Sequence, residues 1–278
     1  MIGSILIGLD GSKYSRRATE LCIRWSQRGN QVTLIGTGIV DEPTISHGEL
    51  VPLGGSAFKE HRDEFLLKDA TKQVGGFLDE FSEACKAAKV PHQMRTLNGN
   101  PEEVLFLAAQ ECDVLVLGQH TYFHFETDDE PCETLAHMLR RTVRPVVTVP
   151  DNLPGSDVVM IAYDATLQAA RALQVFQAVG LDKIHKVHVV SVDQNKGLAH
   201  RNVELAGRFL SHQQIDHTLH PVVSDRSVAD VLLEQADVMN AGLIVMGTYG
   251  NWQISEFLFG SVTQTMLANT KVPMFLYH

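Results

Sequence analysis

Val245-Met-Gly-Thr-Tyr-Gly250 ends an apolar run that begins at Ala241, and nine residues further on the chain reads Gly260-Ser-Val262. The apolar run predicts a buried parallel strand. The hydroxyl-rich segment after Gly260 predicts a helix. A strand that leads through glycines into a helix N-terminus is suited to bind an anion, because backbone N–H groups can approach it closely and the helix start carries partial positive charge. One glycine alone would indicate a turn, whereas this combination favours phosphate binding.

The second half of the chain repeats the pattern of the first. In both copies an apolar strand ends in Asp (Asp10, Asp164), a hydroxyl residue follows two positions later (Ser12, Thr166), and an amphipathic helix comes next. Two later strands also recur, with 113–118 matching 242–247 and 144–149 matching 272–277. The distance in sequence between matching positions is 154 residues at the first strand and 129 and 128 residues at the two later strands. The first half therefore holds about 25 extra residues, and we expect them near the turn-rich segment 41–55.

Strands alternate with helices in each half. In the first half we expect strands over 4–9, 31–38, 91–96, 113–118 and 145–149 and helices over 13–28, 58–89, 101–111 and 132–142. In the second half we expect strands over 158–163, 186–192, 216–222, 242–247 and 273–277 and helices over 166–180, 197–212, 227–240 and 261–269. This order predicts an α/β fold with two tandem, open, doubly wound, parallel five-stranded sheets. The expected domains are 1–150 and 156–278, joined by a Pro- and Gly-containing linker.

Composition narrows the class of protein. The 278 residues are 44% hydrophobic and 20% charged, which is typical of a globular protein with no membrane partner. Residues 1–150 carry 15 basic and 21 acidic side chains and residues 151–278 carry 8 and 12, so neither half is a basic platform for nucleic acid. The start of the chain looks like a strand, with no signal peptide, and the four cysteines form no CxxC pair. We therefore expect a cytoplasmic protein with reduced thiols.

Taken together, the repeat, the strand-terminal Asp with its hydroxyl partner, and the glycine spacing resemble the universal stress protein family, over nearly the whole chain and as two tandem copies. The resemblance implies the open α/β fold called adenine-nucleotide alpha hydrolase-like, pairing as dimers, and binding of ATP or another adenine nucleotide. It implies that Asp164 contacts the ribose and adenine, that Val192 offers backbone contacts to the base, that Met246 and Gly247 line the ribose and phosphate side, and that Gly250, Gly260, Ser261 and Val262 hold the phosphates.

The chemistry of these residues agrees with such roles. A carboxylate at a strand end accepts hydrogen bonds from ribose hydroxyls, and Ser261 with backbone N–H groups donates to phosphate oxygens. For Asp164 the alternative is an N-cap of the following helix. The segment between Gly250 and Gly260 contains no basic residue, so a triphosphate would depend on backbone donors and on a divalent cation such as Mg²⁺.

The first half departs from this pattern. Thr121 stands where the second half has Gly250, and Cys132 and Glu133 stand at the Gly260 and Ser261 positions. Residues 119–133 hold five acidic side chains and no Lys or Arg, so we expect no phosphate binding there. A metal site made by His120, His124, Glu126, Asp128, Asp129 and Cys132 is one interpretation of this loop, and an acidic loop without a ligand is the other.

We expect a stress-linked regulator that binds an adenine nucleotide in its second half, with Mg²⁺ as a candidate counter-ion and no catalytic residues. The last strands of the two halves, 146–149 and 274–277, would pair within the chain, and a further homodimer is compatible with this arrangement. Two other functions remain open: a slow ATPase or nucleotidyl transferase, and a structural protein that binds a partner and no nucleotide.

Overall fold

Ten strands form one sheet in this computed structural model, which describes residues 2–28, 32–47, 56–123, 133–181, 186–248 and 260–278. The first half contains β1 (Ser4–Leu9), α1 (Lys13–Arg28), β2 (Thr33–Val40), α2 (Glu42–His47), α3 (Ser56–Ala88), β3 (His92–Asn98), α4 (Pro101–Ala109), β4 (Val114–Gly118), α5 (Glu133–Arg141) and β5 (Val146–Val149). The second contains β6 (Val158–Ala162), α6 (Leu167–Val179), β7 (Lys186–Asp193), α7 (Lys196–His212), β8 (His217–Val223), α8 (Val228–Val238), β9 (Leu243–Gly247), α9 (Ser261–Asn269) and β10 (Met274–Tyr277).

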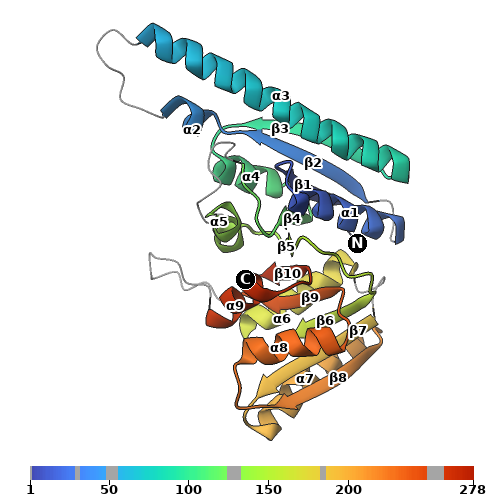
Figure 1. Cartoon of the computed structure of the whole chain (residues 1–278). Coiled ribbons are helices and arrows are strands. Elements are labelled where there is room, and N and C mark those ends of the chain that lie inside the picture. The colour runs from blue at the N-terminus through green and yellow to red at the C-terminus, as the bar shows by residue number, and fades with distance from the viewer. Residues whose placement is uncertain (1, 29–31, 48–55, 124–132, 182–185, 249–259) are drawn as a thin grey trace.

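The strand order is β3-β2-β1-β4-β5-β10-β9-β6-β7-β8. Within each half all pairings are parallel, and the two sets of five meet where β5 pairs antiparallel with β10 (Figure 1). At this seam Phe275 lies opposite Val147 and Met274 opposite Thr148. The predicted α/β fold with five parallel strands in each half is confirmed. The pairing of β5 with β10, the two strands expected to pair, joins both sets into a single sheet.

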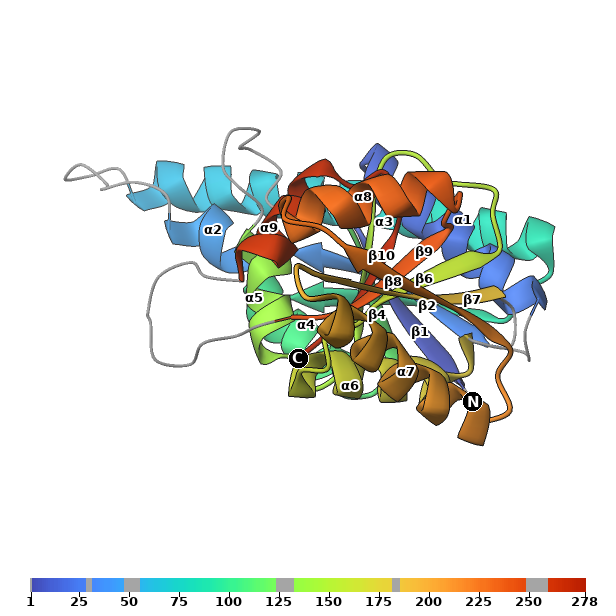
Figure 2. The same ribbon diagram turned by 90° about the horizontal axis from the view of Figure 1, so that it is seen from below.

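Two apolar cores lie on the two faces of this sheet. One joins buried residues of α1 and α3 with those of α6 and α7, and the other joins α4 and α5 with α8 and α9. Parallel strands covered on both sides need apolar residues at successive positions, as β1 shows with Ile5, Leu6 and Ile7 fully buried. Figure 2 shows helices on both sides of the strongly twisted sheet.

Part of the extra sequence of the first half is helical. The short helix α2 was not predicted, and α3 has 33 residues where α7, its counterpart in the second half, has 17. Figure 1 shows α3 as a long rod that runs along the outer edge of the sheet and extends beyond it. Residues 48–55 lie outside the described part of the chain.

The connection between the halves is held along α1. Lys13 Nζ lies 2.8 Å from Asp151 Oδ2, Arg17 donates to the Asp151 carbonyl, Arg24 donates to the Pro154 carbonyl, and Arg28 pairs with Asp157. Exposed ion pairs contribute little stability singly. The hydrogen bonds from Arg17 and Arg24 to backbone carbonyls hold the linker against α1. The predicted linker is therefore an ordered segment that packs on the first half.

Three cysteines lie in the described part of the first half. Cys22, Cys85 and Cys112 are buried free thiols. Burial raises the pKa of the Cys85 thiol to about 12, which keeps it protonated at neutral pH. These thiols therefore act as small apolar side chains in the core.

None of the helices in the described ranges combines the length and the apolar character that crossing a membrane requires.

Candidate functional site

A cavity of about 340 Å³ opens where β6, β7 and β9 end in the second half. We call it the rim cavity, and its lining residues are Ala162, Tyr163, Asp164, Thr166, Ala169, Val190, Val192, Val228, Leu232, Met246, Gly247, Gly260, Ser261, Val262 and Thr263. Its position follows from topology: in an open parallel sheet the crevice forms at the carboxyl ends of strands, where strand order reverses. Here that reversal falls between β6 and β9, which are neighbours in the sheet but not in the chain.

Seven of the eight predicted site residues line the rim cavity: Asp164, Val192, Met246, Gly247, Gly260, Ser261 and Val262. The eighth, Gly250, lies outside the described residues. The other eight lining residues were not among the predicted ones. The period of two along a strand offered a signal for Val190, because it faces the same side of β7 as Val192. No sequence pattern pointed to Val228 and Leu232 of α8, because only the packing of this helix over the strand ends brings them to the cavity.

Asp164 follows β6 directly and is held by the residue two positions later. Its Oδ1 accepts hydrogen bonds from the Thr166 backbone N–H at 3.0 Å and from the Thr166 hydroxyl at 2.6 Å. Thr166, not Asp164, is the N-cap of α6, and its hydroxyl accepts a hydrogen bond from the Ala169 N–H. The N-cap alternative for Asp164 is therefore wrong. Within the described part of the chain no group donates to its Oδ2, so this oxygen can accept a hydrogen bond from a ligand.

Gly247 ends β9 and has a packing role in addition to its place at the cavity. A Cβ on Gly247 would lie 2.4 Å from the backbone carbon of Gln168 and 2.5 Å from the Ala169 nitrogen. The glycine thus lets the first turn of α6 pack directly on the strand end. The same requirement holds in the first half, where a Cβ on Gly118 would lie 2.5 Å from Tyr14 of α1. This glycine of the motif is explained by contact between helix and strand without any ligand.

The N-terminus of α9 forms another part of the cavity wall. Gly260 is the N-cap of this helix, and no side chain caps it. The N–H groups of the first helical residues, Ser261 to Thr263, have no acceptor within the helix, and these residues line the cavity. An uncapped helix start with a hydroxyl beside it is suited to an anionic oxygen.

The rim cavity is apolar at its base and carries little charge. Asp164 is the only charged side chain among its described lining residues, which include no Lys, Arg, His or Cys. Burial, and then the neighbouring Asp164 carboxylate, raise the pKa of the Tyr163 phenol, so that group stays protonated at neutral pH. The cavity therefore offers one carboxylate acceptor, one helix start and an apolar base.

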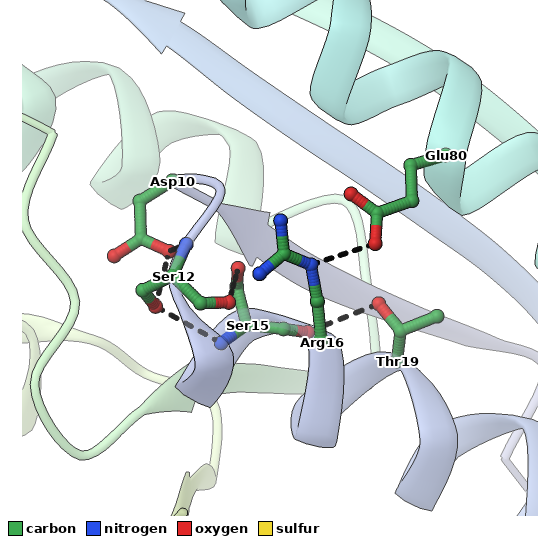
Figure 3. Close-up of polar contacts among 6 residues, drawn as sticks. All are labelled: Asp10, Ser12, Ser15, Arg16, Thr19 and Glu80. Carbon is green, nitrogen blue, oxygen red and sulfur yellow. Dashed lines mark hydrogen bonds and ion pairs between the residues drawn. The ribbon is translucent and has the colours of Figure 1, made fainter.

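The first half builds the same turn at Asp10. There Oδ1 accepts hydrogen bonds from the Ser12 N–H at 3.0 Å and from its hydroxyl at 2.7 Å, and the Ser12 hydroxyl accepts one from the Ser15 N–H (Figure 3). The second oxygen differs from its counterpart on Asp164, because it accepts a hydrogen bond from the Tyr122 N–H at 2.9 Å. The two halves thus share the turn in which an Asp accepts hydrogen bonds from the hydroxyl residue two positions later. They differ in the second oxygen of that Asp, which accepts a hydrogen bond from a backbone N–H only in the first half, among the described residues.

The acidic loop of the first half is described only in part. Thr121, which replaces Gly250, is buried and donates a hydrogen bond to the Gly118 carbonyl at 3.0 Å. Of the residues considered for a metal site, His120 packs its ring 5.0 Å from that of Tyr14, whereas His124, Glu126, Asp128, Asp129 and Cys132 lie outside the described residues. Among the described residues no group of three or more His, Cys, Asp or Glu side chains is placed to hold a metal ion.

A second cavity, of about 260 Å³, lies between α1 and α3. Its base is apolar and includes Phe77 and Phe81, and an ion pair between Arg16 and Glu80 at 2.6 Å lies beside it (Figure 3). Gly11, at φ +75°, borders this cavity, and a Cβ there would lie 2.2 Å from the Phe77 ring. The charged residues that line this second cavity pair with each other, Arg16 with Glu80 and Arg24 with Glu20. None of the predicted site residues lines it.

Comparison with known proteins gives the relationships of the chain. Residues 155–278 match the model of the universal stress protein family. A universal stress protein from Archaeoglobus fulgidus DSM 4304 superimposes with a TM-score of 0.71 at 17% identity, covering 99% of this chain and 97% of that one. A putative universal stress protein from Pseudomonas aeruginosa UCBPP-PA14 gives 0.55 at 15% identity, covering 99% and 93%. None of the curated proteins compared with the chain matches it. At these identities the solved structures support the fold over both halves.

Proposed function

We propose that this chain, whose residues 155–278 belong to the universal stress protein family, binds an adenine nucleotide in the rim cavity and acts as a stress-linked regulator. The observation that carries the proposal is the convergence of residues from separate elements. The strand-terminal Asp164, the β7 residue Val192, the β9 end at Met246 and the α9 start at Ser261 all line one cavity. These elements are far apart in sequence, so their meeting is a property of the fold.

Each part of the cavity fits one part of a nucleotide. The Oδ2 of Asp164 is available to the ribose hydroxyls, which is the role of a strand-end carboxylate in other nucleotide-binding folds. The side chains of Val190, Val192 and Leu232 supply the apolar surface on which a flat base packs. The uncapped start of α9 accepts the phosphate nearest the ribose.

The charge of the cavity bears on which nucleotide binds. Neither the described lining residues nor the sequence between 249 and 259 contains Lys or Arg. A triphosphate brings several negative charges that only backbone donors and the Ser261 hydroxyl would meet, so ATP binding should require Mg²⁺. AMP carries less charge and should bind without the cation. The described lining also lacks a Cys, His or Lys, and we therefore propose a binding role and no dedicated catalysis.

The test is calorimetric titration of the full chain with AMP and ATP, the latter with and without Mg²⁺. Asp164→Ala should weaken AMP binding at least about tenfold, because the Oδ2 acceptor is lost. Asp193→Ala is the matched control: Asp193 also ends a strand of this half and accepts a hydrogen bond from the Asn195 N–H, but it does not line the cavity. Equal affinity in both variants, or no binding by the wild-type chain, would refute the proposal.

A second test addresses the helix start. Gly260→Asp places a carboxylate at the proposed phosphate position and should abolish nucleotide binding while the protein stays folded by circular dichroism. Mass spectrometry of small molecules released from freshly purified protein identifies a resident ligand directly. A released adenine nucleotide supports the proposal, and a different ligand that Gly260→Asp also removes would contradict it.

We also retain the division of the chain into units 1–150 and 156–278. It is supported by the end of β5 at Val149, the start of β6 at Val158, and the match of the family model to the second unit. Expression of residues 156–278 alone tests it. A folded fragment that binds AMP as the full chain does supports the division, and an unfolded fragment contradicts it.

A further inference from the structure

Phe123 is a large aromatic side chain with 0% exposure, and it follows β4 at the rim of the first half. Its ring packs so closely over the backbone of β1 that a Cβ on Gly8 would lie 3.0 Å from the ring. It belongs to the same apolar core as Leu117, Ile39 and Leu105. A fully enclosed aromatic ring in the segment that follows a strand is unusual, because connecting segments run over the surface of a protein.

The register of the sheet identifies what this ring replaces. Ile7 pairs with Val116 in the first half as Ile161 pairs with Val245 in the second. The neighbouring positions therefore correspond, Gly8 to Ala162 and Leu117 to Met246. Both members of the second half, Ala162 and Met246, line the rim cavity.

Strand β2 and helix α4 of the first half correspond in the same way to β7 and α8 of the second half. Gly8 pairs with Thr37 as Ala162 pairs with Val190, so Ile39 corresponds to Val192. Leu105 is the fifth residue of α4, as Leu232 is of α8. Because the Phe123 ring lies against Gly8, the counterpart of Ala162, these correspondences assign it to the part of the first half that is open as the rim cavity in the second.

Tyr122, the residue before Phe123, takes the place of a second part of a ligand. The Tyr122 N–H donates to Asp10 Oδ2 at 2.9 Å, whereas in the described part of the second half no group donates to the equivalent oxygen of Asp164. Tyr122 thus supplies the hydrogen bond that a ribose hydroxyl would supply, and Phe123 supplies the ring that a base would supply. The counterpart of Phe123 in the repeat is Trp252, which lies outside the described residues.

We propose that the first half contains a second site of nucleoside shape, occupied by the protein's own Tyr122 and Phe123. This inference rests on the proposed function for the kind of ligand that the shape takes. The site suits a nucleoside without phosphates, because residues 119–133 carry five acidic side chains and no basic one. On this proposal the chain binds one nucleotide, in its second half, because Tyr122 and Phe123 already fill the corresponding site of the first half.

The consequence is testable by emptying the site. Truncation of a buried aromatic side chain leaves a cavity, and an apolar cavity of sufficient size binds an aromatic ligand. The probe is adenosine, and the background is Asp164→Ala, which weakens binding in the second half at least about tenfold. Asp164→Ala alone should show only this weakened binding, whereas Asp164→Ala with Phe123→Ala should gain one further equivalent of adenosine per chain, with a Kd of about millimolar or lower.

Two controls make the result specific. Adding Asp10→Ala to the Phe123→Ala variant should weaken adenosine binding at least about tenfold, because the ribose acceptor is lost. Replacing Phe65, an exposed phenylalanine of α3, by Ala in place of Phe123 should give no binding beyond that of Asp164→Ala alone. If the Phe123→Ala variant is unfolded alone, millimolar adenosine should restore its circular dichroism, because a ligand of the native state stabilises it.

The outcomes separate this inference from the proposed function. A wild-type chain that binds AMP, together with a folded Asp164→Ala, Phe123→Ala variant that gains no adenosine binding over Asp164→Ala, overturns the inference and leaves the proposed function intact. An unfolded variant that adenosine does not rescue overturns it as well. A wild-type chain that binds no nucleotide overturns the proposed function, and gain of adenosine binding on Phe123→Ala would then support the inference by itself.

Discussion

His188 of β7 and His220 of β8 stack their rings with centroids 5.1 Å apart, and His188 Nδ1 lies 2.9 Å from His220 Nε2. The two side chains share one face of the sheet, because the register pairs His188 with Thr218 and Val190 with His220. One of the two nitrogens must donate a proton and the other must accept it. The hydrogen bond is therefore lost when both rings are protonated.

This pair predicts a loss of stability at acid pH. Burial, and then the neighbouring His188, lower the pKa of His220 below its usual value of 6.5. The unfolded chain then binds more protons than the folded one, so this contribution is full above pH 6.5 and is lost as pH falls below it toward the lowered pKa. In urea unfolding at a series of pH values, His220→Gln should flatten the dependence between about pH 7 and about pH 5. His200→Gln, which changes an exposed histidine of α7, should keep the wild-type slope.

Gly247 and Gly76 should respond to alanine in opposite directions. Gly247→Ala forces a Cβ against the backbone of α6, at 2.4 Å from Gln168, and should lower the free energy of unfolding by about 1–3 kcal/mol. Gly76 lies on an exposed face of α3 with nothing within 4 Å of an added Cβ, and Gly76→Ala should raise stability by about 0.5–1 kcal/mol. Urea denaturation measures both, and equal effects would contradict the packing role of Gly247.

Thr166 and Asn195 are both side-chain N-caps, of α6 and α7. Alanine at either position should lower stability by about 1 kcal/mol in thermal unfolding. Only Thr166→Ala should also weaken AMP binding, by several-fold, because the Thr166 N–H and hydroxyl orient Asp164. A loss of affinity in Asn195→Ala of the same size would mean that the effect comes from stability and not from the site.

Phe275 lies at the seam between the halves. It is fully buried in β10, pairs across the seam with Val147 of β5, and meets Phe176 of α6 edge to face with centroids 5.8 Å apart. Phe275→Ala should lower the free energy of unfolding by about 3–5 kcal/mol. Phe65→Ala, which removes an exposed ring, should change it by less than about 0.5 kcal/mol.

The sequence was sufficient to predict the elements that carry strong periodic signals. The apolar runs that became β1, β4, β6 and β9 mark buried parallel strands, and the repeat of Asp with a hydroxyl two positions later located both strand-to-helix turns. The helix α2 was missed because six residues with a proline at the second position provide too short a pattern for a periodicity argument.

The candidate site was predictable where it depends on residues adjacent in sequence. Asp164 and the start of α9 follow from local motifs, whereas Leu232 of α8 reaches the rim cavity only through packing. The first half shows a further limit of sequence reasoning. Its acidic loop suggested electrostatic exclusion of phosphate, and no sequence pattern pointed to the buried ring of Phe123, on which the proposal of an internally filled site depends. The buried ring packs against Gly8, where a Cβ would lie 3.0 Å from it. Gly8 and Phe123 are far apart in the sequence, so no local sequence pattern indicates this contact.

The antiparallel seam between β5 and β10 joins two copies that differ in sequence, since both belong to one polypeptide. In an assembly of identical chains a substitution alters every copy at once. Here one copy can exchange an open pocket for a solid interior while its neighbour keeps the opening. The covalent tether also holds the two edge strands at an effective concentration of about millimolar or more, whatever the abundance of the protein in the cell. The pairing of the two halves is therefore independent of dilution.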